Sequence, residues 1–249
     1  MQFDDVAISI KSLTKSFGEH TILDNLNIEI PRNKITSLLG FSGAGKSTLL
    51  KHILGLLSPT SGTVNVLGSD LADMSPIQLR EFRRNFGMLF QYAALFDSLS
   101  AKGNVAFPLC EFTDMTEHKI QNKAAELLLS VGIKEVSFDK LPSELSGGMR
   151  KRVGLARGLA LSPAIMLFDE PTTGLDPITT RMVNDLIVET SIKNKDRGMT
   201  SVIISHDIKA TLEISDFIAF LDHGNIVEYL PVNEFVKSKN PLVLEFINL

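Results

Sequence analysis

One stretch of the sequence has the residue types and the spacing needed to hold phosphate groups. Residues 40–47 read Gly-Phe-Ser-Gly-Ala-Gly-Lys-Ser and fit the pattern G-x-x-x-x-G-K-[ST]. Glycines let the backbone curl so that its N–H groups point at the phosphates, and a helix expected from Lys46 adds the positive end of its dipole. Lys46 is predicted to reach the β- and γ-phosphates, and the Ser47 hydroxyl to bind Mg²⁺. The pattern indicates a nucleotide site and leaves kinase, GTPase and ATPase open.

Two adjacent carboxylates stand at the end of a predicted strand. Residues 164–168 are apolar, and Asp169, Glu170 and Pro171 follow them directly. Carboxylates are costly at the end of a buried strand, so their presence indicates chemistry there. Asp169 suits a Mg²⁺ ion, usually through water, whereas Glu170 points another way and can act as a general base on water.

A third motif lies between these two. Leu145, Ser146, Gly147 and Gly148 are followed by Met-Arg-Lys-Arg in a predicted helix. LSGG before a basic helix, shortly ahead of the acidic strand, resembles the signature motif of ABC-type ATPases. Ser146 and the amides of the two glycines would make a second anion site at the helix start. By this resemblance two subunits pair head to tail, and each signature caps the γ-phosphate held by the other subunit's phosphate loop.

The remaining marks of that family follow in order along essentially the whole chain. Phe17 stands where an aromatic ring stacks on adenine, Gln91 at the Q-loop position and His206 at the switch-histidine position. Residues 174–177, Gly-Leu-Asp-Pro, match the D-loop and contain Asp176. The resemblance implies ATP with Mg²⁺, and hydrolysis by positioning and electrostatics rather than by a covalent intermediate.

The same resemblance defines the expected site residues. The expected nucleotide contacts are Phe17, Gly40, Ser42, Gly43, Ala44, Gly45, Lys46, Ser47, Thr48, Ser146, Gly147, Gly148 and Asp176. The expected Mg²⁺ ligands are Ser47, Gln91 and Asp169. The expected catalytic set is Glu170, His206, Gln91 and Lys46.

Two other groups of polar residues are not expected to form catalytic sites. Ser205, His206 and Asp207 are consecutive, and neighbours on a strand point to opposite faces, so they do not form a catalytic triad. The basic run 150–152 is predicted to be a solvated helix face with a small electrostatic effect on nearby phosphates.

The order of strands and helices predicts an α/β fold. Short strands and turns fill the first third, and from residue 164 strands alternate with helices, which indicates a largely parallel sheet. We expect a P-loop NTPase (RecA-like) core with an N-terminal antiparallel β part and an inserted α-helical subdomain. The expected core spans 1–91 and 158–249, and the helical subdomain with the signature spans 92–157.

Two local predictions are specific. In the strand over 21–30, alternation places Ile22, Leu26, Ile28 and Ile30 on one face. A helix over 75–84 is expected to begin with Ser75 as N-cap and proline at its first position.

The composition is that of an ordinary globular chain. Its 249 residues are 44% apolar and 22% charged, and the net charge is −4, without the basic excess of nucleic-acid-binding domains. A single cysteine, Cys110, excludes an internal disulfide and fits a reducing compartment. No apolar run approaches the ~20 residues that span a bilayer, and the first residues are acidic, unlike a signal peptide. A role at a membrane would therefore depend on partners.

Departures from the ABC pattern point to a subfamily. Met149 stands where most signatures have Gln, Phe41 where Pro or Asn is common, and Gly174 where Ala or Ser is commoner. With residues 88–109, MLFQYAALFDSLSAKGNVAFPL, they resemble the ATPases of MCE-type lipid transporters, such as the Mla lipid-asymmetry system. That resemblance implies a second copy of the chain, an integral-membrane permease, a periplasmic MCE-domain protein and, in some systems, a STAS-domain regulator. It implies a peripheral location at the cytoplasmic face of the inner membrane and a phospholipid or other lipid cargo.

Other functions stay open. An ATPase of an amino-acid or metal importer has the same motifs but would normally lack AALFDSLSAKGNV. A soluble ABC ATPase of iron–sulfur assembly has a similar size and needs no permease. A P-loop kinase of another class would lack LSGG and the switch histidine.

The C-terminal segment 240–249 is predicted to be a short helix with one apolar face, formed by Leu242, Val243, Phe246 and Ile247. A ten-residue helix is marginal alone in water, so it must dock on something. Its own core and the second ATPase subunit are both open as docking surfaces.

Overall fold

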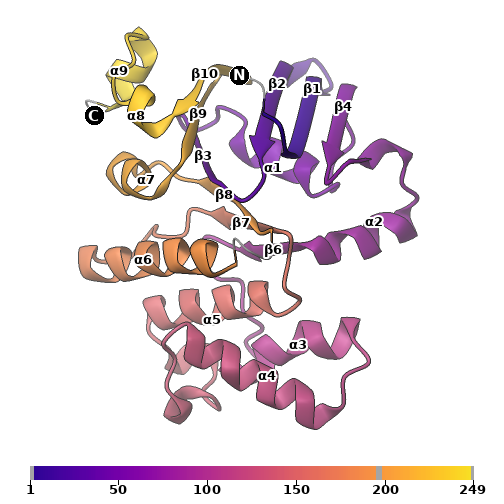
Figure 1. Cartoon of the computed structure of the whole chain (residues 1–249), viewed down its shortest axis with the longest axis vertical. Helices are drawn as coiled ribbons and strands as arrows, with labels where there is room; N and C mark the ends of the chain where they lie inside the picture. The colour runs from indigo at the N-terminus through magenta and orange to yellow at the C-terminus, as the bar shows by residue number, and fades with distance from the viewer. Residues whose placement is uncertain (1–2, 195–197, 248–249) are drawn as a thin grey trace. The chain divides into compact units, whose positions relative to one another are not determined.

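Apolar alternation near the N-terminus produces an antiparallel sheet. The computed structural model describes residues 3–194 and 198–247 (Figure 1). Its first sheet has the order β2-β1-β4-β5, and β1 pairs antiparallel with both β2 and β4. Alternate apolar side chains of β1, such as Ile8 and Ile10, are fully buried. These strands are β1 (Val6–Phe17), β2 (His20–Pro31), β4 (Ser61–Val66) and β5 (Ser69–Asp70).

The buried face of β2 differs from the prediction at one residue. Leu23 is completely buried, whereas Ile22 is only partly buried. The cause is an irregularity at Asn25, which has φ of 48° in the left-handed region and lies where the pairing with β1 shifts register. An extra residue in one strand reverses which side chains face the core. The prediction for Ile22 is therefore wrong, and Leu23 takes its place beside Leu26.

A largely parallel sheet carries the loop with the phosphate-binding pattern. Strand β3 (Ile35–Leu39) lies between β9 (Phe217–Asp222) and β8 (Thr200–Ile204), parallel to both, and β10 (Asn225–Pro231) runs antiparallel to β9. The helices of this part are α1 (Lys46–Ile53), α2 (Pro76–Phe82) and α7 (Ile208–Ile214). The predicted capping of α2 is confirmed, because Ser75 Oγ accepts from Gln78 N and the Gln78 side chain accepts from Ser75 N.

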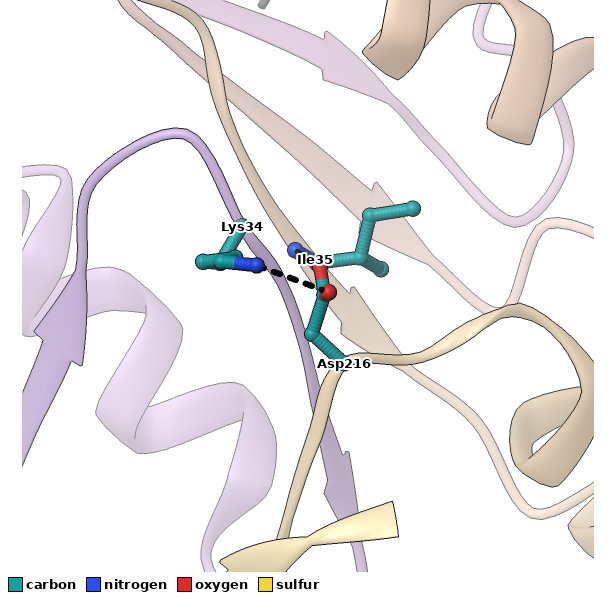
Figure 2. Close-up of polar contacts among 3 residues, drawn as sticks. All are labelled: Lys34, Ile35 and Asp216. Atoms are coloured by element: carbon teal, nitrogen blue, oxygen red, sulfur yellow. Dashed lines mark hydrogen bonds and ion pairs between the residues drawn. The ribbon is translucent and has the colours of Figure 1, made fainter. Parts of the chain in front are cut away.

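One carboxylate fixes where β3 begins. Asp216, just before β9, accepts from the backbone N–H of Ile35 at 2.9 Å and pairs with Lys34 Nζ at 3.2 Å, as Figure 2 shows. Asp216 N donates in return to Ile35 O at 2.9 Å. Because both groups on the first residue of β3 are held, the far end of this short buried strand delivers the glycine-rich loop at a defined place.

The middle of the chain is mainly helical, as expected. Strands β6 (Phe86–Leu89) and β7 (Ile165–Asp169) pair in parallel. Three helices pack on one another, and a longer helix follows β7 (Figure 1). They are α3 (Ala101–Phe112), α4 (Glu117–Ser130), α5 (Gly147–Leu159) and, after β7, α6 (Pro177–Lys193).

The chain divides into two compact units. The first unit comprises Met1–Arg83 and Thr200–Leu249, and the second comprises Arg84–Met199. These units differ from the expected core over 1–91 and 158–249 and the expected helical subdomain over 92–157, which remain a prediction. Within the described residues, no helix is both long enough and apolar enough to cross a membrane.

The C-terminal helix packs on its own unit. Two short helices follow β10: α8 (Val232–Phe235) and the C-terminal helix α9 (Pro241–Ile247), both yellow in Figure 1. Val243 and Phe246 are buried in a cluster with Leu39, Phe220 and Phe235. The Phe246 ring lies 5.0 Å from the ring of Phe220. Of the two predicted docking surfaces, the one that the structure shows is the chain's own core.

Phe246→Ala should therefore destabilise the single chain. Emptying a buried aromatic site typically costs about 3–5 kcal/mol, which lowers Tm by roughly 6 °C or more in a chain of this size. Leu244→Ala, on the exposed side of the same helix, should change Tm little. Thermal denaturation at several protein concentrations measures both. A loss of Tm that appears only at concentrations where the chain dimerises would contradict packing within one chain.

Candidate functional site

The phosphate loop in the first unit depends on close backbone contacts that only glycine permits. The loop joins β3 to α1, and Gly40 and Gly45 have φ of 149° and 106°. A Cβ on Gly40 would lie 2.0 Å from the carbonyl oxygen of Leu221, and one on Gly45 would lie 2.8 Å from Leu23 Cδ2. The Leu221 carbonyl leaves no space for a side chain at Gly40, whereas at Gly45 it is chiefly the backbone conformation that requires glycine.

Hydrogen bonds and ring contacts hold this loop in place. Gly224 N, in the turn after β9, donates to Ala44 O at 3.1 Å, and Gly224 O accepts from Asp24 N at 3.2 Å. The ring of Phe41 lies 5.9 Å from the ring of Phe220 and 5.2 Å from that of Phe246. The departure from the usual Pro or Asn at position 41 thus places the loop against the C-terminal helix.

The loop gathers positive charge and backbone donors. Lys46 Nζ donates to Gly40 O at 2.6 Å and to Phe41 O at 2.9 Å, so its ammonium lies over the loop. The α1 N-cap is Gly45, so no side chain at that position caps the first turn of α1. Ser42, Gly43 and Ser47 are exposed, Ala44 is buried, and Thr48 is partly buried in the first turn. This arrangement suits an anion with several oxygens.

Two further predicted residues belong to the same unit. Phe17, at the end of β1, is 49% exposed, and Lys15 Nζ lies 5.0 Å from its ring centre. His206 follows β8 and is exposed.

The neighbours of His206 have structural roles. Ser205 Oγ accepts from Asp207 N, and Asp207 caps α7 by accepting from Ala210 N, each at 3.0 Å. That the three consecutive residues form no catalytic triad remains a prediction.

The signature motif in the second unit forms the start of α5. Ser146 is the N-cap and accepts from Met149 N at 3.3 Å. A Cβ on Gly148 would lie 2.5 Å from Thr179 Cγ2, and one on Gly147 would lie 3.5 Å from Leu175 Cδ2. The glycines of the signature therefore allow α5 to pack closely against the D-loop and the start of α6.

Asp176 of the D-loop is the N-cap of α6. Its carboxylate accepts from Ile178 N and Thr179 N at 3.0 Å each, and from Thr179 Oγ1 at 2.5 Å. These hydrogen bonds, above all the one from the Thr179 side chain, hold the pKa of Asp176 below its usual range. The carboxylate is thus ionised and fixed in direction. Its contact with a nucleotide remains a prediction.

The acidic end of β7 has an unusual backbone. Glu170 has φ of 48°, in the left-handed region that side chains with a Cβ rarely occupy. Its carboxylate accepts from Thr173 Oγ1 at 3.2 Å. Its carbonyl accepts from Thr173 N at 3.3 Å and from Lys151 Nζ at 3.2 Å. The turn that aims the Glu170 side chain is therefore held by an ammonium from α5.

Comparison with known proteins identifies the family. The model of the family described as "ABC transporter" matches residues 23–173. The chain belongs to this family. It is an α/β P-loop NTPase that binds ATP and hydrolyses it as a subunit of a transporter.

Relatives of this ABC ATPase extend over almost its whole length. It is 40% identical to a probable ribonucleotide transport ATP-binding protein of Mycobacterium leprae, over 98% of this chain and 69% of that protein. It is 38% identical to the intermembrane phospholipid transport ATP-binding protein MlaF of Haemophilus influenzae, over 96% of this chain and 89% of that protein. It is 41% identical to the methionine import ATP-binding protein MetN of Carboxydothermus hydrogenoformans, over 97% of this chain and 71% of that protein.

A solved structure gives the same result. The chain is similar to a dimeric ATP-binding cassette in a post-hydrolysis state bound to ADP and Pi, with a TM-score of 0.81 and 31% identity. The match covers 90% of this chain and 98% of that one.

The site residues expected of this ABC ATPase fall into two groups. The first unit holds Phe17, the phosphate loop from Gly40 to Thr48, and His206; the second holds Gln91, the signature, Asp169, Glu170 and Asp176. In the second unit, Gly148 of the signature lies against Thr179, whose N–H and hydroxyl donate to Asp176 of the D-loop. Within the described residues, no three His, Cys, Asp or Glu side chains gather as metal ligands.

The burial of Lys151, between the Q-loop and the end of β7, differs from the prediction. Lys151 was predicted to lie on a solvated face, but it is only 5% exposed. Its Nζ donates to Gln91 O as well as to Glu170 O. Burial lowers the pKa of Lys151 to about 8, although the carboxylates of Glu170 and Asp169 act to raise it. The 3,4 spacing of the buried residues Gly148, Lys151 and Leu155 is the signal that could have placed Lys151 on the inner face of α5.

Lys46→Ala should weaken ATP binding. The substitution removes a cation worth about 1.5–3 kcal/mol in a charged hydrogen bond, which is roughly a 10- to 100-fold rise in Kd. Lys51→Ala removes an exposed cation from the same helix and should leave Kd unchanged. Titration with a fluorescent ATP analogue measures both. Equal affinities for the two variants would remove Lys46 from the phosphate site.

Proposed function

We propose that this ABC ATPase drives an MCE-type transporter that moves phospholipid or another lipid between the inner and outer membranes. The observation that carries the lipid assignment is the similarity to MlaF along 89% of that protein. The stretch AALFDSLSAKGNV after Gln91 and the Met at position 149 support the same assignment.

In this proposal two copies of the chain bind two ATP molecules between them, head to tail. The phosphate loop from Gly40 to Thr48 and the ring of Phe17 hold the nucleotide from one copy. Ser146, Gly147, Gly148 and Asp176 approach it from the other copy. The dimeric arrangement of the solved cassette with ADP and Pi supports this pairing.

Hydrolysis in the closed dimer needs a base and fixed positive charge. Glu170 orients the attacking water and takes its proton. Lys46, His206 and the amides of the partner copy's signature stabilise the charge that develops on the γ-phosphate. Gln91 links the site to the helical part, whose movement on closure drives the permease.

Mg²⁺ is part of the proposal. The Ser47 hydroxyl, the Gln91 amide and the Asp169 carboxylate present oxygen donors, which are the ligands that this ion prefers. Since ATP supplies the remaining oxygens, a full cage of protein carboxylates is not needed. When bound, the ion neutralises charge on the β- and γ-phosphates.

The proposed partners follow from the transporter type. They are a second copy of the chain, an integral-membrane permease, a periplasmic MCE-domain protein and, in some systems, a STAS-domain regulator. The proposed location is peripheral, at the cytoplasmic face of the inner membrane. The proposed contact with the permease lies near Gln91 and the helical subdomain 92–157, where Phe90 and Tyr92 are exposed.

The runner-up is the ATPase of another importer. The 41% identity to a methionine import ATP-binding protein favours this alternative, because it is higher than the 38% identity to the phospholipid relative. A soluble ABC ATPase of iron–sulfur assembly is a more distant possibility, supported only by chain size and motif content.

Affinity purification of the tagged chain from detergent-solubilised membranes tests the assignment. A permease, an MCE-domain protein and bound phospholipid should co-purify, and an untagged strain provides the control. Recovery of a permease with a soluble amino-acid- or metal-binding protein would support the runner-up instead. Recovery of no membrane protein would contradict both transporter assignments.

Glu170→Gln should abolish steady-state ATP turnover while leaving ATP binding intact. A neutral amide keeps the shape of the side chain but cannot accept the proton of water, which should cost about 100-fold or more in kcat. An ATP-dependent dimer should accumulate, measured by size-exclusion chromatography. Glu135→Gln, on an exposed turn of the same unit, should behave like the wild type. Turnover near wild type in Glu170→Gln would remove Glu170 from the role of base.

A further inference from the structure

Lys151 connects two motifs that are far apart in the sequence. Its Nζ donates to the backbone carbonyls of Gln91, at the start of the Q-loop, and of Glu170, at the end of β7. The side chain reaches them from α5, directly after the signature, and it is 95% removed from solvent by the surrounding unit. One ammonium group therefore touches the backbone of both a proposed Mg²⁺ ligand and the proposed base.

Glu170 needs external support to keep its orientation. With φ of 48°, its backbone is in a region that is unfavourable for any residue with a Cβ. Such a conformation persists only when neighbouring groups hold it. Thr173 holds the side chain and, through its N–H, the carbonyl. Lys151 donates a second hydrogen bond to that carbonyl.

The start of the Q-loop is held by the same helix. Ala93 and Ala94 both have positive φ, 60° and 46°. Arg157, on α5, donates to Ala93 O at 2.8 Å and to Ala94 O at 2.7 Å. Helix α5 thus fixes residues 91–94 with two cations, and Lys151 is the one that also reaches Glu170.

We infer that Lys151 is a positioning residue for hydrolysis, which sets the direction of the Glu170 carboxylate relative to Gln91. A displacement of residues 91–94 is then transmitted through a single side chain to the group that deprotonates water. The inference rests on the proposed role of Glu170 as base. Lys151 contacts neither the nucleotide nor the reacting atoms in this role.

Stability alone does not account for a lysine at this position. Burying an ammonium is costly, and a methionine of similar length would fill the same space without that cost, although the carbonyls of Gln91 and Glu170 would each lose a hydrogen bond. These two effects on the free energy of unfolding oppose each other. Loss of Lys151 should therefore change Tm little, whereas the catalytic rate should fall.

The experiment compares Lys151→Met with Arg152→Met in the full chain, purified from membranes with the proteins that stay bound. Arg152 is the next cation on α5, but it donates to Gly132 O, outside both motifs. Lys151→Met should change Tm by no more than a few degrees and ATP affinity by no more than about twofold, and should lower kcat about 10- to 100-fold, because misplaced groups lose rate rather than binding. Arg152→Met should leave kcat unchanged. A normal kcat in Lys151→Met, or a loss of kcat that follows a loss of Tm, would overturn the inference.

The Glu170→Gln background separates this inference from the proposal on which it rests. If Lys151 acts through Glu170, adding Lys151→Met to Glu170→Gln should not lower the residual single-turnover rate further. A further 10-fold fall or more would show an independent effect and overturn the inference. If Glu170→Gln alone kept normal turnover, the role of Glu170 as base would fail instead, whatever Lys151→Met does.

Discussion

The close approach of backbone to backbone around the phosphate loop is the constraint on which the first unit depends. Gly40 faces the carbonyl of Leu221 at a distance that leaves no space for a Cβ, and a Cβ on Gly45 would lie 3.1 Å from the carbonyl oxygen of Ile22 in β2. The turn at Gly224 is tied to the loop through Ala44 and to β2 through Asp24. The loop can therefore keep its shape only if β3 lies beside β9 and the β9–β10 turn reaches β2. The order of the strands and the shape of the phosphate loop therefore depend on the same steric requirement.

In the second unit the motifs are held by side chains and by the first turns of helices, rather than by close backbone contacts. Ser146 and Asp176 begin two helices, and the missing side chain at Gly148 lets Thr179 approach between them. Two hydrogen bonds join Thr179 to Asp176, and Gly148 lies against Thr179, so the signature and the D-loop are neighbours within one chain. A change at either motif should therefore be felt at the other, before any second copy is considered.

The parts that could be predicted from the sequence are those whose chemistry is local. The phosphate loop, the acidic strand end and the Ser75 cap depend on residue types at fixed short spacings, and the structure places them as expected. Leu23 was missed because a bulge at Asn25 shifts the face of the strand, and a bulge has no reliable pattern. The packing of Phe41 on Phe246 was missed because it joins residues more than two hundred positions apart. Such long-range contacts follow from strand order, which the motifs do not specify.

Lys151 shows why charge patterns are a weak guide to burial. In a run of three cations, the expectation of a solvated face is correct for most proteins. Here the 3.6-residue period turns the middle one inward, where two carbonyls with nearby carboxylates compensate for part of its desolvation. The remaining cost is visible as a lowered pKa. In return, the ammonium supplies a hydrogen bond to the carbonyl of Glu170, a residue whose backbone conformation is unfavourable unless neighbouring groups hold it.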